Sequence, residues 1–285
     1  MNMNLGFELR GLAMVGFDLG MEGYGRARGE AFQRQLLERV RALPGVEGAA
    51  FANALPLDLE ISNTNAYEAG QPAPRASEMP SPQVYDVSPG YFATLKMPLV
   101  AGREYRDDDP PETRRLVVNE AFTRKVLRGV RQPAEALGRR VVVGGQRSVF
   151  EIIGVAADGK YLSLADHDKP VMFFSTVGNW TPSTRLVART RGDARELLGR
   201  LRQTVLALDS RMALFGENTL AEHLNLPLLP SRVAGATLGA FALVTLLLAA
   251  IGIYGTAAFA VARRTREIGV RVAVGASPGQ IARLV

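Results

Sequence analysis

Residue types that could carry catalysis or bind a metal are few and scattered in this chain. The sequence has no cysteine and only two histidines, His167 and His223. Without cysteine there is no thiol nucleophile, no disulfide and no cysteine-based zinc site. His167 lies in a polar stretch with no further ligand or nucleophile in register, which favours a solvated turn. We expect His223, just before the most apolar stretch, to be structural or to lie at an interface.

Two further motifs could be read as ligand sites. Asp107-Asp108-Asp109 could suggest calcium, but it lacks the alternating ligand spacing of an EF-hand, so we expect a solvated acidic loop. No G-x-x-x-x-G-K-[ST] motif occurs, because the glycine-containing stretch 138–145 lacks the Lys-Ser/Thr pair. We therefore expect no cofactor and no ATPase activity in this chain. The single tryptophan, Trp180, lies in a polar loop that we expect to be exposed or partly packed.

The basic charge of the chain is concentrated at one end. The net charge is +6, with 34 Lys and Arg residues against 28 Asp and Glu. Six of the bases and one of the acids follow Ser231, which leaves 28 bases and 27 acids in the first 231 residues. The excess therefore lies beside the most apolar stretch. This pattern is typical of the cytoplasmic flank of a membrane helix and argues against a nucleic-acid partner.

An uncharged run of 30 residues, 233–262, predicts a transmembrane helix. About 20 apolar residues suffice to span a bilayer. The alternative is a buried core helix of a soluble protein, but core helices rarely run this long without a charge. Three arginines follow the run at once and only Arg232 precedes it, so the positive-inside rule places the C-terminal side in the cytoplasm. Gly235 and Gly239 form a G-x-x-x-G pair that would let another helix approach closely.

The first residues, MNMNLGFELRG, lack the basic n-region and the apolar core of a signal peptide. A domain outside the membrane needs a preceding export signal or helix. We therefore expect this chain to be a truncated piece of a longer membrane protein.

Two β-α-β patterns bracket the part before the apolar run. Residues 13–18, 25–43 and 46–53 predict a strand, an amphipathic helix and a strand. Residues 185–190, 194–208 and 212–215 repeat this order, with Asp193 as the helix N-cap. We expect the two units to pair into one split α/β subdomain made of residues 8–56 and 184–222.

Residues 57–183 would form an inserted, mixed α/β subdomain. Strands are predicted at 83–87, 116–118, 139–143, 150–156 and 171–175, and short helices at 89–95 and 119–127. Gly144-Gly145 predicts a hairpin turn. The predicted fold class is α+β: an extracytoplasmic domain of two α/β subdomains over residues 1–230, one long transmembrane helix over 231–262, and a short cytoplasmic segment over 263–285.

The segment after the apolar run is the most informative. Residues 267–274 predict a short helix, Gly275 is a suitable C-terminal stop, and Ser277-Pro278-Gly279-Gln280 has the composition of a capping box that begins another helix. Arg264 and Arg271 would be available to acidic partners. By residue chemistry alone, this segment fits a surface for a protein partner and a basic anchor on anionic lipid equally well.

The string RRTREIGVRVAVGASPGQIARLV closely resembles the cytoplasmic loop after the second transmembrane helix of MacB/FtsX-type ABC transporter permeases. Upstream, the strings LLERVRALPGV, VSPGYF, AGR, VNEAF and FEIIGV resemble the MacB-like periplasmic core domain in the same order. The resemblance covers about residues 6–285 and is greatest to the acidobacterial permeases that carry this module twice. That family has one more helix before the domain and two more after the loop, and we expect this chain, as a truncated piece, to be without them.

The resemblance implies a permease component that couples ATP hydrolysis on a partner to motion of a periplasmic domain, in export or mechanotransmission. The positions that match the family's ATPase-docking helix are Arg266, Glu267, Ile268, Gly269, Arg271 and Gly275. The implied partners are an ABC ATPase subunit, membrane lipid, a second copy or a second permease module, and a periplasmic adaptor, all at a bacterial inner membrane. The alternatives are an FtsX-like scaffold that regulates extracytoplasmic cell-wall hydrolases, and a non-functional permease fragment.

Overall fold

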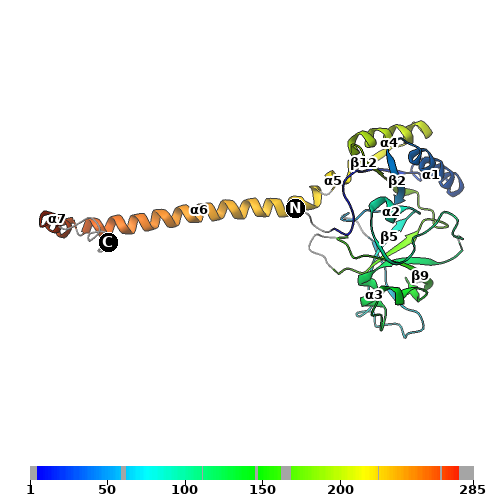
Figure 1. Cartoon of the computed structure of the whole chain (residues 1–285), viewed down its shortest axis with the longest axis horizontal. Coiled ribbons are helices and arrows are strands. Elements are labelled where there is room, and N and C mark those ends of the chain that lie inside the picture. The colour runs from blue at the N-terminus through cyan, green and yellow to red at the C-terminus, as the bar shows by residue number, and fades with distance from the viewer. Residues whose placement is uncertain are drawn as a thin grey trace. The chain divides into compact units, whose positions relative to one another are not determined.

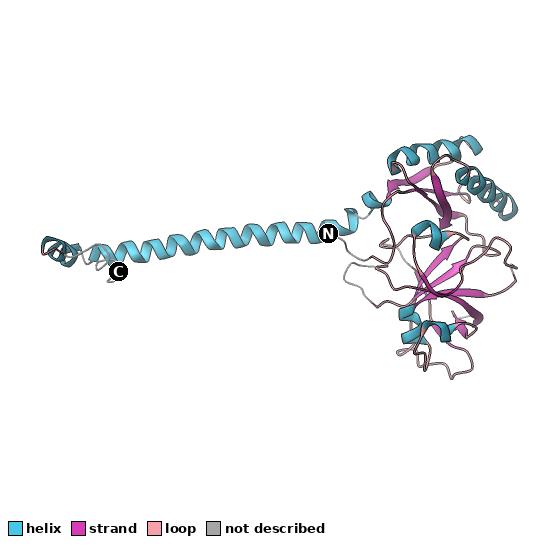
Figure 2. Cartoon of the chain, in the orientation of Figure 1, coloured by secondary structure: helices cyan, strands magenta, loops and turns pink. Residues whose placement is uncertain are grey.

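The computed structural model of the chain describes residues 5–58, 62–110, 112–144, 147–161, 168–223, 225–263 and 265–275. The chain divides into two compact units, Met1–Pro227 and Leu228–Val285. Strands occur in the first unit, and the described part of the second is helical (Figures 1 and 2).

The first unit alternates strands with short helices. Its first half contains β1 (Leu12–Asp18), α1 (Arg26–Arg41), β2 (Val46–Ala52), β3 (Ser62–Asn63), β4 (Ala66–Glu68), β5 (Gln83–Val87), α2 (Tyr91–Leu95) and β6 (Leu99–Gly102). Its second half contains β7 (Arg115–Asn119), α3 (Glu120–Val126), the 3-10 helix η1 (Pro133–Ala136), β8 (Arg140–Val143), β9 (Ser148–Ala156), β10 (Val171–Ser175), β11 (Ser183–Thr190), α4 (Ala194–Leu208), β12 (Leu214–Thr219) and α5 (Leu220–His223).

The strands of this unit join in one 12-stranded sheet with the order β12-β1-β11-β2-β5-β10-β7-β9-β8-β4, while β3 pairs with β5 and β6 with β9. The pairs β5–β10 and β7–β9 are parallel, and the others are antiparallel. The two parts predicted as subdomains meet at β2 and β5, where the ladder has a single residue pair, Ala52 and Val87. The sheet thus runs through the predicted boundary, and the division into subdomains stays a prediction.

The helices α1 and α4 lie side by side on one face of the sheet (Figure 1). Each helix buries an apolar stripe at three- and four-residue spacing, Phe32, Leu36 and Val40 on α1 and Leu197, Leu201 and Val205 on α4. Strand residues of alternating position complete this core, including Val15, Phe51 and Leu186. The expected pairing of two β-α-β units is observed, because β1, β11 and β2 are neighbours in the sheet.

A second core lies on the opposite face of the same strands. It contains the other alternating residues, such as Met14, Ala50 and Val187, together with Tyr91 and Phe92 of α2. A third cluster joins α3 and η1 to β7, β8 and β9. The α+β class predicted from the sequence is therefore confirmed for the first unit.

Most predicted elements are observed within a few residues. The strands at 83–87 and 171–175 and the helix at 194–208 have the predicted bounds. The last predicted strand, 212–215, begins later in the structure, at Leu214, because Met212 N–H donates to Asp209 O at 3.2 Å and closes a turn before β12. In the predicted hairpin, Val143 pairs with Ser148 across the turn, whereas Gly145 lies outside the described residues.

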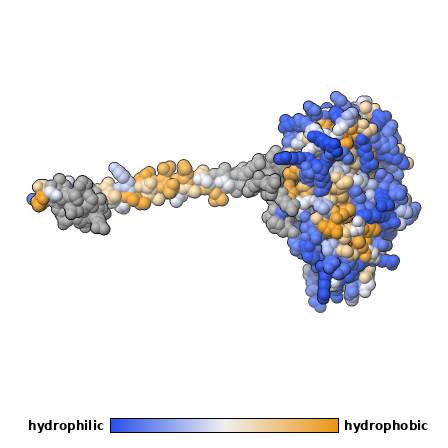
Figure 3. All heavy atoms as spheres, in the orientation of Figure 1, coloured by the Kyte–Doolittle hydropathy of each residue, from blue (hydrophilic) through white to orange (hydrophobic). Residues whose placement is uncertain are grey.

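The second unit consists of the long helix α6 (Asn225–Arg263), which begins at the end of the first unit, and the short helix α7 (Thr265–Ala273). Within α6, the stretch Thr237–Ala260 is long and apolar enough to cross a membrane, with a mean hydropathy of 2.2. None of its most apolar window is buried, and apolar side chains lie along the helix (Figure 3). A core helix of a soluble protein would bury this surface, so the observation favours a membrane helix.

Candidate functional site

The residues predicted to dock on an ATPase lie on and just after α7. Arg266 and Gly269 are exposed there, whereas three side chains of the predicted site lie outside the described residues: Glu267, Ile268 and Arg271. Gly275 has a φ of +96°, the left-handed conformation that glycine adopts without strain. The predicted end of the helix at Gly275 is therefore confirmed. The docking role of these residues stays a prediction.

The small-residue pair predicted to pack helices is open to approach. A Cβ built on Gly235 or Gly239 would have no heavy atom of the described residues within 4 Å, apart from the backbone of its own helix and its chain neighbours. Space for another helix is thus present on α6, and its use stays a prediction.

The motifs considered for metal binding do not form such a site. Among the residues that the structure describes, no group of three or more His, Cys, Asp and Glu side chains could hold a metal ion. His167 lies outside the described residues. Asp107 and Asp108 are exposed, as a solvated loop requires, but the expectation is wrong for Asp109, whose side chain is only 10% exposed.

Asp109 is held by two arginines. Its carboxylate accepts two hydrogen bonds from Arg103, at 2.7 and 3.0 Å, and one from the Arg106 backbone N–H at 3.0 Å. Arg115 also pairs with it. The Arg103 hydrogen bond, aided by the Arg106 N–H and the positive charge of Arg115, lowers the pKa of Asp109 to about 2. This carboxylate therefore attaches its loop to β7 through Arg115. Its oxygens are already occupied by Arg103, Arg115 and the Arg106 N–H, so they are not available to a cation.

The buried tyrosines of the unit also serve packing. Tyr85, Tyr91 and Tyr161 surround Phe173, with ring centroids 5.5 to 6.3 Å from it. Burial raises the pKa of each of these tyrosines, which keeps them protonated. Tyr105 donates to Phe173 O at 2.6 Å and accepts from a backbone N–H. None of them has the lowered pKa that a nucleophile or general base would need.

Trp180 lies partly buried on α1, in agreement with the expectation of a partly packed loop. A Cβ on Gly29 would lie 2.3 Å from its ring, so only glycine allows this close contact. Arg26 and Gln33 hold the same loop by hydrogen bonds to Gly178 O and Thr181 O. The groove beside it is lined by three basic and three acidic side chains: Arg26, Arg34, Arg41, Glu30, Glu38 and Asp107. Because these charges balance, the groove favours neither an acidic nor a basic ligand.

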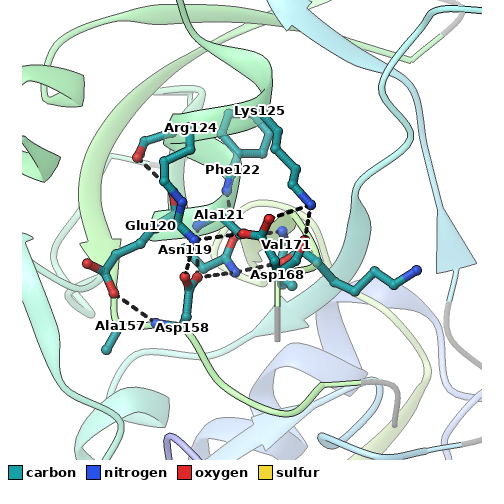
Figure 4. A network of polar contacts seen from close by, with 12 residues as sticks. Asn119, Glu120, Ala121, Phe122, Arg124, Lys125, Ala157, Asp158, Asp168 and Val171 are labelled. Carbon is teal, nitrogen blue, oxygen red and sulfur yellow. Dashed lines mark hydrogen bonds and ion pairs between the residues drawn. The ribbon is translucent and has the colours of Figure 1, made fainter. Parts of the chain in front are cut away.

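A polar network surrounds the junction of β7 and α3 (Figure 4). Asn119 is 1% exposed and is the N-cap of α3, where its Oδ1 accepts from the N–H groups of Phe122 (3.0 Å) and Val171 (2.8 Å). Its Nδ2 donates to Asp158 and to Lys169 O, both at 2.8 Å. One amide side chain thus joins β7, α3, β10 and the segment after β9. The sequence predicted a helix starting here, but the partners of Asn119 outside that helix are 39 or more positions away and have no local signal.

The acidic groups of this network are fully used. Asp158 accepts from Ala121 N–H at 2.8 Å and from Arg124 at 2.5 Å. Asp168 pairs with Arg124 at 2.7 Å and with Lys125 at 2.8 Å, and these two cations lower its pKa. In Figure 4 the side chains of Asn119, Arg124 and Asp158 point toward one another. The network can stabilise the fold, but it presents no free acid, base or metal ligand.

The segments that enter and leave the first unit are held by buried charged residues. Arg189 on β11 is 2% exposed and donates to the backbone oxygens of Glu8 (2.7 Å), Arg10 (2.5 Å) and Thr94 (2.6 Å). Burial lowers its pKa. At the other end, His223 on α5 lies 2.8 Å from Asp58, as expected for a structural histidine.

Family comparisons match nearly the whole described chain. Residues 11–213 match the family described as MacB-like periplasmic core domain, and residues 239–285 match the FtsX-like permease C-terminal family. These matches follow each other in the order of the two units.

Two curated relatives share the domain at low identity. The "Probable export ATP-binding/permease protein MacB" of Pseudomonas entomophila is 27% identical over 214 residues, which cover 70% of this chain and 30% of that protein. The "Probable syringafactin export ATP-binding/permease protein SyfD" of Pseudomonas syringae pv. tomato is 26% identical with the same coverage. The match therefore spans about a third of the length of these relatives.

A solved structure, the periplasmic region of MacB from Actinobacillus actinomycetemcomitans, aligns with a TM-score of 0.48 at 12% identity, covering 77% of this chain and 94% of that one. The domain match covers well over half of the sequence, it carries the predicted motifs in the predicted order, and a membrane-length helix follows it. The chain belongs to the MacB/FtsX-type ABC transporter permease family, as a MacB-like periplasmic core domain followed by an FtsX-like permease segment.

Proposed function

We propose that this chain is the membrane-spanning permease part of an ABC export system, in which a partner ATPase docks on α7 and moves the extracytoplasmic domain through α6. The observation that carries the proposal is the order of parts along the chain. A charge-balanced α+β domain is followed by a membrane-length helix, and the cations come immediately after that helix. The permease match covers this last part.

The charge distribution supports residues 1–230 outside the membrane, 231–262 within it and 263–285 in the cytoplasm of a bacterial cell with this protein in its inner membrane. The names of both curated relatives describe export with ATP binding, which favours export over a scaffold for cell-wall hydrolases. No nucleotide-binding motif occurs in this sequence, so ATP hydrolysis is assigned to a partner. Membrane lipid, a second permease module or copy at Gly235 and Gly239, and a periplasmic adaptor complete the proposed set of partners.

The topology can be tested by single cysteines, because the natural chain has none. Asp108→Cys lies on the exposed loop of the domain, and Gly269→Cys lies on α7 without changing its charge. A membrane-impermeant maleimide added to spheroplasts should label Asp108→Cys at once and Gly269→Cys only after the membrane is permeabilised. The cysteine-free chain is the control. Equal labelling of both positions in intact spheroplasts would contradict the proposed topology.

The docking assignment needs a separate test. Glu267→Arg should reduce co-purification of an ABC ATPase subunit that is co-expressed with this chain, because it reverses the charge at a position matched to the family's docking helix. Glu112→Arg makes the same change on an exposed site of the domain and should leave co-purification unchanged. Equal recovery of the ATP-binding subunit with both variants would show that Glu267 does not contribute to docking.

A further inference from the structure

The short helix α5 is the last element of the first unit before α6 begins at Asn225. It is attached at three points. Leu220 is 1% exposed and belongs to the second core, which also contains Tyr91 and Phe92. Glu222 pairs with Arg195, whose side chain is 74% exposed. His223, 15% exposed, lies against Asp58. The last contact is the closest of the three in sequence to the membrane helix.

Asp58 occupies a buried charged site. Its side chain is 6% exposed, and its Oδ2 accepts from Leu55 N–H at 2.7 Å and pairs with Arg185 at 2.9 Å. Its Oδ1 lies 2.8 Å from His223 Nε2. Burial alone would raise the pKa of Asp58, but the contacts with His223, Leu55 N–H and Arg185 outweigh burial and lower it. The carboxylate therefore remains charged and needs its partners.

Asp58 links His223 to the sheet, because it also pairs with Arg185. Arg185 lies on β11 and also donates to Asn53 O at 2.7 Å. β11 pairs with β1 on one side and with β2 on the other. Side chains four residues apart on a strand share a face, so Arg185 and Arg189 project from the same face of β11. Arg189 holds the segment that enters the domain, and Arg185, through Asp58, reaches the segment that leaves it.

The two polar contacts of α5, Glu222 with Arg195 and His223 with Asp58, differ in burial. Exposed pairs such as Glu222 with Arg195 contribute little, because water screens the charges. Removal of His223 takes one of three partners from the buried Asp58 carboxylate, and the loss of a partner at a buried polar site is costly. The contact between His223 and Asp58 is thus the polar attachment of α5 that leads to β11, whereas Glu222 accepts hydrogen bonds from Thr219 at the end of β12.

We propose that His223 is a positioning residue, which, through Asp58 and Arg185, fixes α5 to β11 so that displacement of α6 is passed to the sheet instead of being lost in a loose linker. This inference rests on the proposed function, because it assumes that α6 moves. It assigns the transmission of that movement to one buried contact and names the strand that receives it.

The test uses the full chain in lipid nanodiscs, with a spin label on Ala221→Cys, an exposed position of α5 in a chain without other cysteines. His223→Phe keeps a ring but removes the donor, whereas His223→Gln keeps a donor at a similar reach. Arg195→Ala breaks the exposed pair of the same helix and is the matched control. Label mobility and hydrogen exchange of the α5 amides are measured for each variant.

We expect His223→Phe to raise amide exchange in α5 about tenfold and to loosen the label, because a local attachment is lost. His223→Gln should behave as the natural chain, and Arg195→Ala should change exchange by less than about twofold. Asp58→Asn, which retains an acceptor for Leu55 N–H, should also loosen the label. Exchange in β11 should stay slow in all variants, which shows that the sheet is intact.

The proposal is overturned if His223→Phe matches Arg195→Ala, or if His223→Gln is as mobile as His223→Phe. The measurement requires no ATPase, so its failure leaves the docking assignment untouched. Conversely, His223→Phe should not reduce co-purification of the ATP-binding subunit, because His223 is not on α7. Failure of docking with an intact α5 attachment would count against the proposed function alone.

Discussion

Asp109→Asn tests how much the buried end of an acidic loop stabilises the domain. The pKa of Asp109 falls from its ordinary value of 3.8 to about 2. One pKa unit is worth about 1.4 kcal/mol, so this shift alone corresponds to about 2.5 kcal/mol. The side chains of Arg103 and Arg115 are still 34% and 26% exposed, and we reduce the expected loss for solvent screening to about 1.5 kcal/mol.

The measurement is the free energy of unfolding of the first unit, from denaturant titration of the detergent-solubilised chain followed by Trp180 fluorescence. Trp180 is the only tryptophan and packs on α1, so its emission reports this unit. Asp108→Asn is the matched control, because the neighbouring aspartate is exposed. At pH 7 we expect a loss of about 1.5 kcal/mol for Asp109→Asn and little change for Asp108→Asn.

The pH dependence fixes the sign of the effect. A carboxyl with a lowered pKa in the folded state stabilises the fold above its unfolded pKa and loses this contribution as pH falls through the folded value. The gap between the natural chain and Asp109→Asn should therefore close as pH falls from about 4 to about 2. Equal losses for both asparagine variants at pH 7, or a gap that persists at pH 2, would refute the assignment of the stabilisation to the Asp109 charge.

Three further predictions concern other buried contacts. Asn119→Ala should lower the free energy of unfolding by about 3 kcal/mol or more, because it leaves two buried N–H groups without an acceptor; denaturant titration checks this. Gly29→Ala should displace Trp180, shift its emission and cost about 1–3 kcal/mol, since the new Cβ would lie 2.3 Å from the ring. Arg189→Met should raise hydrogen exchange over residues 5–10, because the backbone oxygens of Glu8 and Arg10 lose their donor; unchanged exchange there would contradict this role.

The regular elements could be predicted because their signals are local. The helix over 194–208 carries an apolar stripe of period 3.6 behind an aspartate N-cap, and both features occur in the structure. The strand 83–87 alternates buried and half-buried side chains and follows Pro82, and the strand 171–175 begins with an apolar run that follows Pro170. The short strands β3, β4 and β6 were missed, because two to four residues are too few to show an alternating pattern.

Side-chain partners could not be predicted, because they depend on contacts between distant segments. Three adjacent aspartates look alike in sequence, and only the fold shows that Asp109 faces two arginines. Likewise, Asp58 and His223 are far apart in the sequence, and neither has a local pattern that indicates the other. The family was more accessible, since its motifs are properties of the sequence itself.

The ladder between β2 and β5 is the shortest in the sheet, because it has the single residue pair Ala52 and Val87. The second core nevertheless extends across the boundary between β2 and β5, because it contains both Val187 of β11 and Phe173 of β10. Packed cores transmit displacement because they are dense and resist deformation. We therefore expect motion that enters at His223 to move both parts of the sheet as one body. A distance between spin labels on β12 and β8 should then stay constant through an ATP cycle, and a change in that distance would show that the sheet opens at β2 and β5.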